Sequence, residues 1–182
     1  MAWSFAKLFR PSGLEVNAYR LYQQTVNQAR NPVFYESWGV PDTPLGRFDA
    51  IALHCFLVLN RLGKDAGTDL FAEKFSEAIF TDMDRSLREM GTGDLSVGKK
   101  VRKLAEGFYG RSAAYGRALE DGGTALATTL GRNLYGEAVQ PDSAVLDAVA
   151  AYVRDSVDIL QSQPAEALMA GNIRFASPGG EC

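Results

Sequence analysis

Histidine, cysteine and long apolar runs are scarce in this sequence. Its 182 residues include one histidine, His54, and two cysteines, Cys55 and Cys182. Two cysteines are too few for the disulfide framework of a small secreted domain, and together with one histidine they are too few for most classes of zinc site. We therefore expect the fold to depend on a hydrophobic core, and we predict no metal and no other cofactor.

The sequence also lacks a membrane-spanning run and an excess of basic residues. Its most apolar run, residues 51–59, contains His54 and falls well short of the roughly 20 apolar residues that a membrane-spanning helix needs. The net charge of −3 argues against a dedicated nucleic-acid-binding protein, which is usually strongly basic. Hydrophobic residues make up 46% of the chain and charged residues 23%, which is typical of a globular domain.

The first residues combine aromatic and basic side chains. Trp3 and Phe5 stand near Lys7 and Arg10, a mixture that suits a short helix at a membrane interface. The alternative is that these aromatic rings fold back onto the core. No secretory signal is recognisable in this segment.

The rest of the chain carries apolar residues at helical spacings, separated by glycine and proline, and no segment alternates with the period of a strand. This pattern predicts an all-α protein, a single-domain bundle of about six to seven helices with an extended or disordered C-terminal tail. We divide the chain into an N-terminal arm at 1–13, a helical domain at 14–176 and a tail at 177–182. Helices are expected near residues 14–30, 44–62, 69–90, 97–119, 124–135 and 143–160, with short helical turns near 33–38 and 165–170.

Several helix ends carry recognisable signals. Thr43 stands where an N-cap is expected, with Pro44 at the first helical position. Gly91 is expected to end a helix in the left-handed conformation, and Ser96 to cap the next one. The glycines between residues 107 and 116 predict that another backbone passes close to that helix, because glycine inside a helix is otherwise costly.

Two motifs that carry chemistry elsewhere fail on inspection. Residues 93–100 nearly match a phosphate-binding loop, but lysine replaces the final Ser or Thr and a helix, not a strand, precedes the loop. Asp82 and Asp84 point about 200° apart on a helix and so cannot share a metal ion. Arg85 and Arg88 lie within pairing reach of these carboxylates. We predict a glycine-rich turn between two helices and a solvated, ion-paired helix face.

His54 lies on a helix stripe with Arg47 and Arg61. Two nearby guanidinium groups would lower the pKa of the imidazole, and the sequence offers no nucleophile beside it. We predict a packed, hydrogen-bonded histidine. Cys55 falls on the apolar stripe and is predicted to be an inert core thiol.

Two features leave alternatives open. Tyr35 and Trp38 stand beside a loop, where they either anchor a partner or, for Trp38, close one end of the bundle. Residues 99–117 contain six basic residues and one acidic residue, whereas residues 118–182 contain three basic and nine acidic residues. The basic segment either attracts an anionic partner, such as a phospholipid surface or an acidic protein, or pairs with the acidic helix near 143–160.

Five segments of the chain resemble the ubiquinol–cytochrome c chaperone family, and the resemblance spans roughly residues 15–176. The two longest are specific, because mixed strings of glycine and charged residues of that length rarely recur by chance. The segments are ARNPVFY at 29–35, GVPDTPLGRFD at 39–49, FTDMDRSLREMGTGDLSVGK at 80–99, GFYGRSAAY at 107–115 and GNIRF at 171–175.

The resemblance implies an all-helical, non-catalytic assembly factor for ubiquinol–cytochrome c reductase, respiratory complex III. Such a protein binds newly made cytochrome b, and some members work with a small second assembly factor. No transit peptide is evident, so we expect a bacterial member that acts in the cytoplasm, peripherally associated with the inner face of the cytoplasmic membrane.

A binding chaperone needs an exposed apolar surface with a charged rim. Two alternatives come from other classes: a carrier of haem or another small ligand that uses His54, and a purely structural homo-oligomer. The aromatic residues expected at the client surface are Tyr35, Trp38 and Phe80, and the expected polar rim is Arg47, His54, Asp82, Arg85, Arg88 and Lys99.

Overall fold

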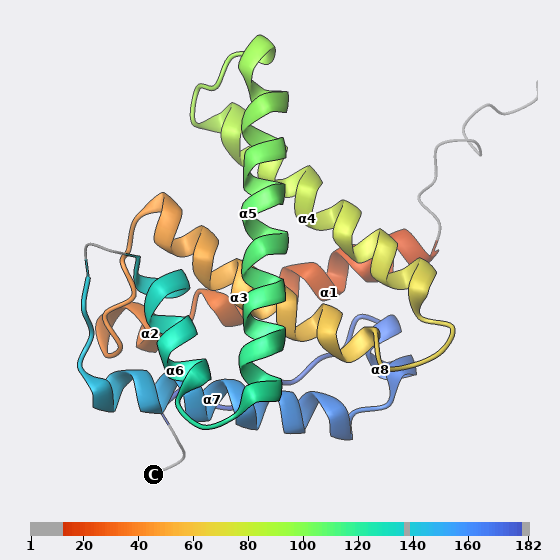
Figure 1. Ribbon diagram of the computed structural model, residues 1–182. Coiled ribbons are helices and arrows are strands. Elements are labelled where there is room, and N and C mark those ends of the chain that lie inside the picture. Colours follow the sequence, from red (N-terminus) through yellow and green to blue (C-terminus); the bar gives the residue numbers. More distant parts are fainter. Residues whose placement is uncertain (1–12, 137–138, 180–182) are drawn as a thin grey trace, which may run out of the picture.

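The structure is a computed structural model that describes residues 13–136 and 139–179. All regular secondary structure in these residues is helical (Figure 1), which confirms the predicted all-α class. None of their helices is long and apolar enough to span a bilayer. Apart from Gly13, the predicted N-terminal arm lies outside the described residues. The helices are α1 (Gly13–Ala29), α2 (Pro32–Glu36), α3 (Pro44–Leu62), α4 (Asp69–Glu89), α5 (Asp94–Asp121), α6 (Ala125–Leu130), the π-helical turn η2 (Gly131–Tyr135), α7 (Ser143–Ser162) and α8 (Ala165–Met169).

Helix α3 lies at the centre of the molecule and is buried on almost every side. Leu53 and Leu57 face one apolar cluster, which α6 and α7 complete. Cys55 and Val58 face a second cluster, which α1 and α4 complete. Each fully buried aliphatic side chain contributes about 1.5–3 kcal/mol relative to an exposed one. The core therefore has two halves with α3 between them, and the prediction that Cys55 is a core thiol is confirmed.

The start of α3 follows its sequence signals. The Thr43 side chain accepts a hydrogen bond from the Gly46 amide at 3.1 Å, and Pro44 occupies the first turn, as predicted. A Cβ atom at Gly46 would lie 2.0 Å from the carbonyl oxygen of Pro41. Only glycine lets the preceding loop pass this close to the first turn of the helix.

The junction between α4 and α5 is partly as predicted. Gly91 ends α4 with a φ of 82°, the left-handed conformation expected of it. The prediction that Ser96 caps the next helix is wrong, because α5 already begins at Asp94 after Gly93. The Ser96 hydroxyl instead donates to the Gly93 carbonyl oxygen at 3.0 Å.

The prediction of a backbone close to the glycines of α5 is also wrong. A Cβ atom at Gly110 would meet no heavy atom within 4 Å, and one at Gly107 would meet only the side chain of Arg111. At Gly116 the nearest atom belongs to the Phe56 ring, at 4.0 Å. These glycines face solvent or side chains, so packing does not require them.

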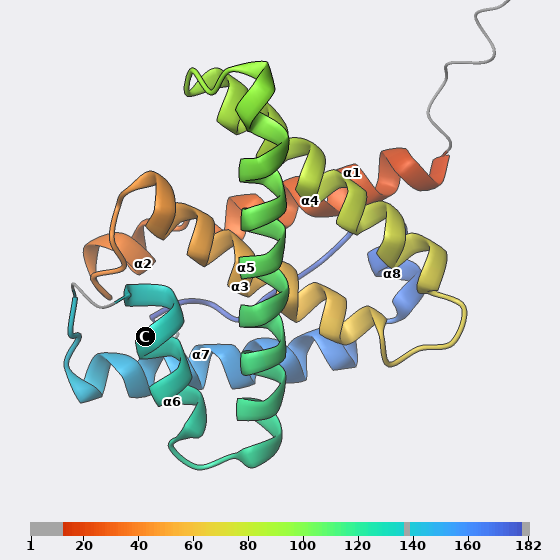
Figure 2. The same cartoon turned by 45° about the horizontal axis from the view of Figure 1, so that its top comes forward.

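Helices α4 and α5 form an antiparallel hairpin whose outer end stands clear of the other helices (Figures 1 and 2). The apolar stripe of α4 is buried as far as Met83, but Met90 is 59% exposed. Met90 keeps the helical spacing of this stripe, and Leu45, which is 60% exposed, keeps the spacing of the buried stripe of α3. Helical periodicity therefore continues past the point where another helix covers the stripe.

The segment after α8 has no regular secondary structure over residues 172–177 and runs back across the molecule (Figure 2). The Arg174 amide donates to the Gln163 side-chain oxygen at 2.8 Å, and the Ala176 amide donates to Ser156 Oγ at 3.2 Å. The Phe175 ring lies 5.4 Å from the ring of His54. These contacts make the segment part of the core.

Replacing Thr43 by Ala should lower the free energy of unfolding by about 1 kcal/mol, because the Gly46 amide loses its capping acceptor. Thr124 stands at the equivalent position of α6, where its side chain makes no capping bond. Thr124→Ala is therefore the matched control, and we expect it to change the stability by less than about 0.5 kcal/mol. Chemical denaturation followed by circular dichroism measures both; equal losses would contradict the role of the Thr43 cap.

Candidate functional site

The residues predicted for a client surface lie in three separate parts of the molecule. Tyr35 and Arg47 lie at the corner between α2 and α3, and Trp38 and His54 lie in the core. The others lie on the α4–α5 hairpin. This last group consists of Phe80, Asp82, Arg85, Arg88 and Lys99.

At the α2–α3 corner, an aromatic ring and a guanidinium group are held together. The Arg47 guanidinium carbon lies 5.9 Å from the centre of the Tyr35 ring and its Nε donates to Asp42 at 2.5 Å. The Tyr35 hydroxyl donates to the Ala29 carbonyl oxygen at 2.8 Å. Arg47 is about half exposed, so this corner presents a small polar and aromatic surface to solvent.

Trp38 closes one end of the bundle, which is one of the two roles considered for it. Its exposed fraction is only 8%. Its ring packs edge-on against Phe34 at 5.2 Å and against Tyr152 at 5.6 Å. In this conformation the ring is not available to a partner.

His54 is fully buried and both ring nitrogens have partners. Nδ1 lies 2.7 Å from the Ala50 carbonyl oxygen, and Nε2 lies 2.7 Å from the Tyr152 hydroxyl. Because the first contact requires a proton on Nδ1, the Tyr152 hydroxyl donates to Nε2. The prediction of a packed, hydrogen-bonded histidine is confirmed, and this arrangement leaves neither nitrogen free for a haem iron.

Burial, and not the neighbouring arginines, lowers the pKa of His54 to about 4. Arg47 is directed to Asp42, and Arg61 is directed to Asp65 and to the end of α7. The sequence-based explanation through two guanidinium groups is therefore wrong, although the direction of the shift is the same.

An exposed aromatic surface lies between α4 and α5. Phe80 of α4 packs against Phe108 at 6.1 Å and Tyr109 at 5.8 Å, and Tyr109 is 55% exposed. Beside Phe80 is an open depression of about 560 Å³. We call the rings of Phe80 and Tyr109 together with this depression the Phe80 surface. The depression is lined by Glu77, Phe80, Thr81 and Asp84.

The charged residues of α4 divide between two faces of the helix. Asp82 faces α1, where it accepts a hydrogen bond from the Tyr22 hydroxyl at 2.8 Å and pairs with Arg85. Arg88 pairs with Asp84 at 2.6 Å, on the side of the depression, and also with Asp94 of α5. The predicted ion pairs are confirmed, but Asp82 is turned towards α1 and not to solvent. At the Phe80 surface, one lining carboxylate is that of Asp84, with which Arg88 pairs.

The basic segment 99–117 does not pair with the acidic helix α7 in the described part of the chain. Arg102 pairs with Glu106 in the next turn of α5, and Arg111 pairs with Asp49 of α3. Lys99 and Lys103 have no ion pair among the described residues, and both are exposed. Contact of this segment with an anionic partner stays a prediction.

Asp49 and Arg111 form an ion pair at the interface of α3 and α5. Asp49 Oδ1 lies 2.9 Å from Arg111 Nη2, and the Asp49 side chain is 8% exposed. Burial raises the pKa of Asp49 to about 6, although the positive charge of Arg111 opposes the shift. The guanidinium also lies over the Phe48 ring, 5.8 Å from its centre.

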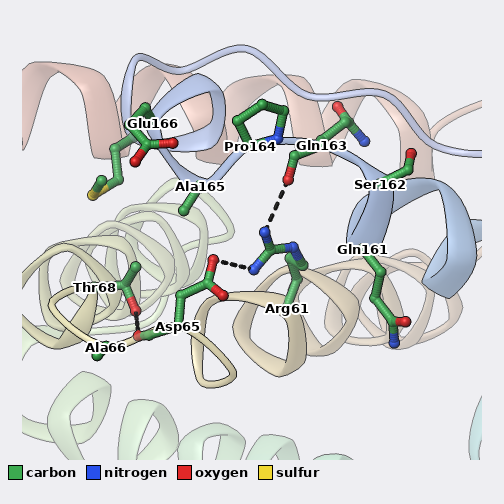
Figure 3. Close-up of a pocket in the computed structure, with 11 residues that line it drawn as sticks. Arg61, Asp65, Ala66, Thr68, Gln161, Ser162, Gln163, Pro164, Ala165 and Glu166 are labelled. Atoms are coloured by element: carbon green, nitrogen blue, oxygen red, sulfur yellow. Dashed lines mark hydrogen bonds and ion pairs between the residues drawn. The ribbon is translucent and has the colours of Figure 1, made fainter.

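A polar hollow of about 540 Å³ lies where the end of α3 meets the turn between α7 and α8 (Figure 3). Arg61 reaches into it and donates to the carbonyl oxygens of Leu160 and Gln163, each at 2.8 Å. Its third nitrogen donates to Asp65 at 2.5 Å. All three guanidinium nitrogens donate hydrogen bonds within the protein, so Arg61 links the end of α3 to the end of α7.

Sequence reasoning missed Tyr109 and the Asp49–Arg111 pair. Tyr109 follows Phe108 of the buried stripe, and one residue turns a helix by about 100°, so its exposure could have been inferred. The Asp49–Arg111 pair left no local signal, because the two residues meet only when α3 and α5 pack together.

Together these features describe a helical protein with exposed aromatic and basic surfaces. Residues 36–175 match the sequence pattern of the family described as Ubiquinol-cytochrome C chaperone. The chain belongs to this family, and the resemblance found in the sequence is confirmed.

Two relatives extend the comparison. The crystal structure of the Cbp3 homolog from Brucella abortus superimposes with a TM-score of 0.80, with 39% sequence identity and coverage of 91% of each chain. The Xenopus laevis protein named Ubiquinol-cytochrome-c reductase complex assembly factor 1 is 24% identical over 157 residues, which cover 86% of this chain and 78% of the frog protein.

Two buried groups of α3, His54 and Asp49, should make opposite contributions to stability in acid. The pKa of His54 is 6.5 in the unfolded chain and about 4 in the folded protein. Between these values, the unfolded state binds a proton at His54 and the folded state does not. Stability is therefore lost as the pH falls from 6.5 to 4. The pKa of Asp49 is 3.8 in the unfolded chain and about 6 in the folded protein. Between these values, only the folded state binds a proton at Asp49, so stability is gained as the pH falls from 6 to 4.

Between about pH 4 and 6, each residue changes the free energy of unfolding by up to about 1.4 kcal/mol per pH unit. His54→Gln should remove the loss of stability that His54 causes as the pH falls. Asp49→Asn should remove the opposing gain, so the stability of that variant should fall more steeply with pH. Urea denaturation at several pH values in this range measures the slope of the free energy of unfolding against pH. This slope does not depend on how much each substitution destabilises the protein overall. Parallel slopes in the wild type and both variants would contradict the assignment.

Proposed function

We propose that this protein is a non-catalytic assembly chaperone that binds newly made cytochrome b and promotes the assembly of ubiquinol–cytochrome c reductase. The observation that carries the proposal is membership of the ubiquinol–cytochrome c chaperone family over residues 36–175. Similarity to a frog protein named as an assembly factor of that reductase complex supports the same role.

We propose the Phe80 surface as the principal client contact. Tyr109 offers an exposed aromatic ring, and the depression beside Phe80 is large enough for apolar side chains of a client helix. Arg88 and Asp84 stand at its edge as a paired, polar rim. The corner formed by Tyr35 and Arg47 is proposed as a second, smaller contact.

The other residues of the expected client surface are assigned different roles. Trp38 and His54 hold α2, α3 and α7 together, because their rings pack against Tyr152. Asp82 and Arg85 join α4 to α1 through Tyr22. We do not propose a haem carrier, since both nitrogens of His54 are engaged within the core.

We propose that the protein works at the inner face of the cytoplasmic membrane, associated peripherally. The basic segment 99–117 supports this location, because Lys99 and Lys103 are exposed and have no carboxylate partner among the described residues. A small second assembly factor, implied by the family resemblance, is a further proposed partner. No role with nucleic acid is proposed, because the net charge is −3.

Purification of the tagged protein from its own cells, in mild detergent and with a cross-linker, should enrich cytochrome b over other subunits of the complex. Tyr109→Glu places a charge on the Phe80 surface and should reduce the recovered cytochrome b at least about tenfold. Mass spectrometry with isotope-labelled peptides measures the recovery.

Leu70→Glu is the matched control, because Leu70 is 57% exposed at the opposite end of α4. Circular dichroism verifies that both variants are folded. Wild-type protein that recovers no cytochrome b would contradict the proposed function. Equal recovery by the wild type and Tyr109→Glu would contradict only the assignment of the Phe80 surface.

A further inference from the structure

The outer end of the α4–α5 hairpin carries two large apolar side chains in solvent. Leu95 is fully exposed and Met90 is 59% exposed. Both lie beyond the last buried residues of the hairpin, Met83 on α4 and Val97 on α5. Figures 1 and 2 show this end projecting away from the body of the protein. Exposed apolar side chains at the end of a projection are typical of an interaction site.

Lysines follow Leu95 along one face of α5. Leu95, Lys99 and Lys103 are four residues apart, which places them on the same side of the helix. At 1.5 Å per residue, Lys99 stands about 6 Å and Lys103 about 12 Å behind Leu95 along the helix axis. All three are exposed, so the apolar end is followed by a basic zone.

The carboxylates of this part of the hairpin all lie beside arginines. Each pairs with an arginine, whereas Lys99, Lys100 and Lys103 have no carboxylate partner in the described part of the chain. Lys100 donates to the Thr92 hydroxyl at 3.1 Å. Residues 90–103 contain four basic side chains and one acidic side chain, Asp94, so the end of the hairpin offers positive charge to a partner. The arginine pairs are Asp82–Arg85, Glu89–Arg85, Asp84–Arg88, Asp94–Arg88 and Glu106–Arg102.

We infer that the end of the α4–α5 hairpin docks on an anionic phospholipid surface. Leu95 and Met90 enter the boundary between headgroups and acyl chains, which accepts apolar side chains to a depth of about 5–10 Å. At that depth, Lys99 and Lys103 lie at the level of the lipid phosphates. We call residues 90–103 the hairpin tip.

The shape of the tip favours a membrane over a protein partner. The apolar side chains stand at the projecting end of the hairpin, and the open depression lies further along α4, beside Phe80. A projecting apolar end with lysines behind it fits a flat, negatively charged layer better than it fits a folded protein. The inference deepens the proposed function by naming the surface that keeps the chaperone at the membrane, while vesicle binding itself is measured without any client.

Binding of the full chain to vesicles tests the inference. Vesicles of phosphatidylcholine alone are compared with vesicles of equal parts phosphatidylcholine and phosphatidylglycerol, by sedimentation at low and high salt. We expect binding to the anionic vesicles, weakened by salt. Leu95→Glu combined with Met90→Glu should weaken it at least about tenfold, and each Lys→Gln change at Lys99 or Lys103 should weaken it about fivefold.

Leu70→Glu again serves as the control and should bind like the wild type. Leu95→Trp provides a second readout, because brominated lipid should quench its added fluorescence if residue 95 enters the bilayer. Unchanged binding in the tip variants, or no quenching at residue 95, would overturn the inference and assign attachment to another part of the chain.

The same tip variants are also tested for recovery of cytochrome b. Loss of vesicle binding with normal recovery of cytochrome b supports the inference and separates the two surfaces. No vesicle binding by the wild type, together with loss of cytochrome b in the tip variants, would make the tip a protein contact and overturn the inference while the proposed function stands. If the wild type recovers no cytochrome b, the proposed function fails, and the vesicle result still decides the inference.

Discussion

Three polar side chains of the buried helix α3 have partners on the helices that pack around it, although Asp49 Oδ1 makes no hydrogen bond within its ion pair. Asp49 pairs with Arg111 of α5, His54 with Tyr152 of α7, and Arg61 with carbonyl oxygens at the end of α7. Buried polar groups without partners are costly. These contacts therefore set the positions of α5 and α7 relative to α3, while α1 and α4 pack against it through apolar side chains.

The side chains of α3 with reactive groups are buried in the core and do not reach the surface of the protein. The side chains that first attract attention as reactive, His54 and Cys55, are fully buried, and each has a pKa shifted by burial towards its neutral form. The Phe80 surface, the Tyr35–Arg47 corner and the hairpin tip are the surfaces that we propose for partners.

Local signals made most of the fold predictable. The start of α3 at Pro44 and the end of α4 at Gly91 depend on residues next to each other in the sequence, and both predictions were correct. The surfaces were less predictable, because exposure depends on distant helices. Met90 continues an apolar stripe past its last partner, and Asp82 turns to Tyr22, which is 60 residues away in the sequence. The partner of His54 is 98 residues away, so its hydrogen bonding could be expected but Tyr152 could not be named.

The amount of ubiquinol–cytochrome c reductase in membranes of cells that lack this protein tests the central claim most directly. Difference absorption spectra of the b-type haems, with immunodetection of the complex, provide the measurement. We predict that the complex is lost, that the wild type and a folded His54→Gln variant restore it, and that Tyr109→Glu does not. Normal levels of the complex in cells without the protein would contradict the account.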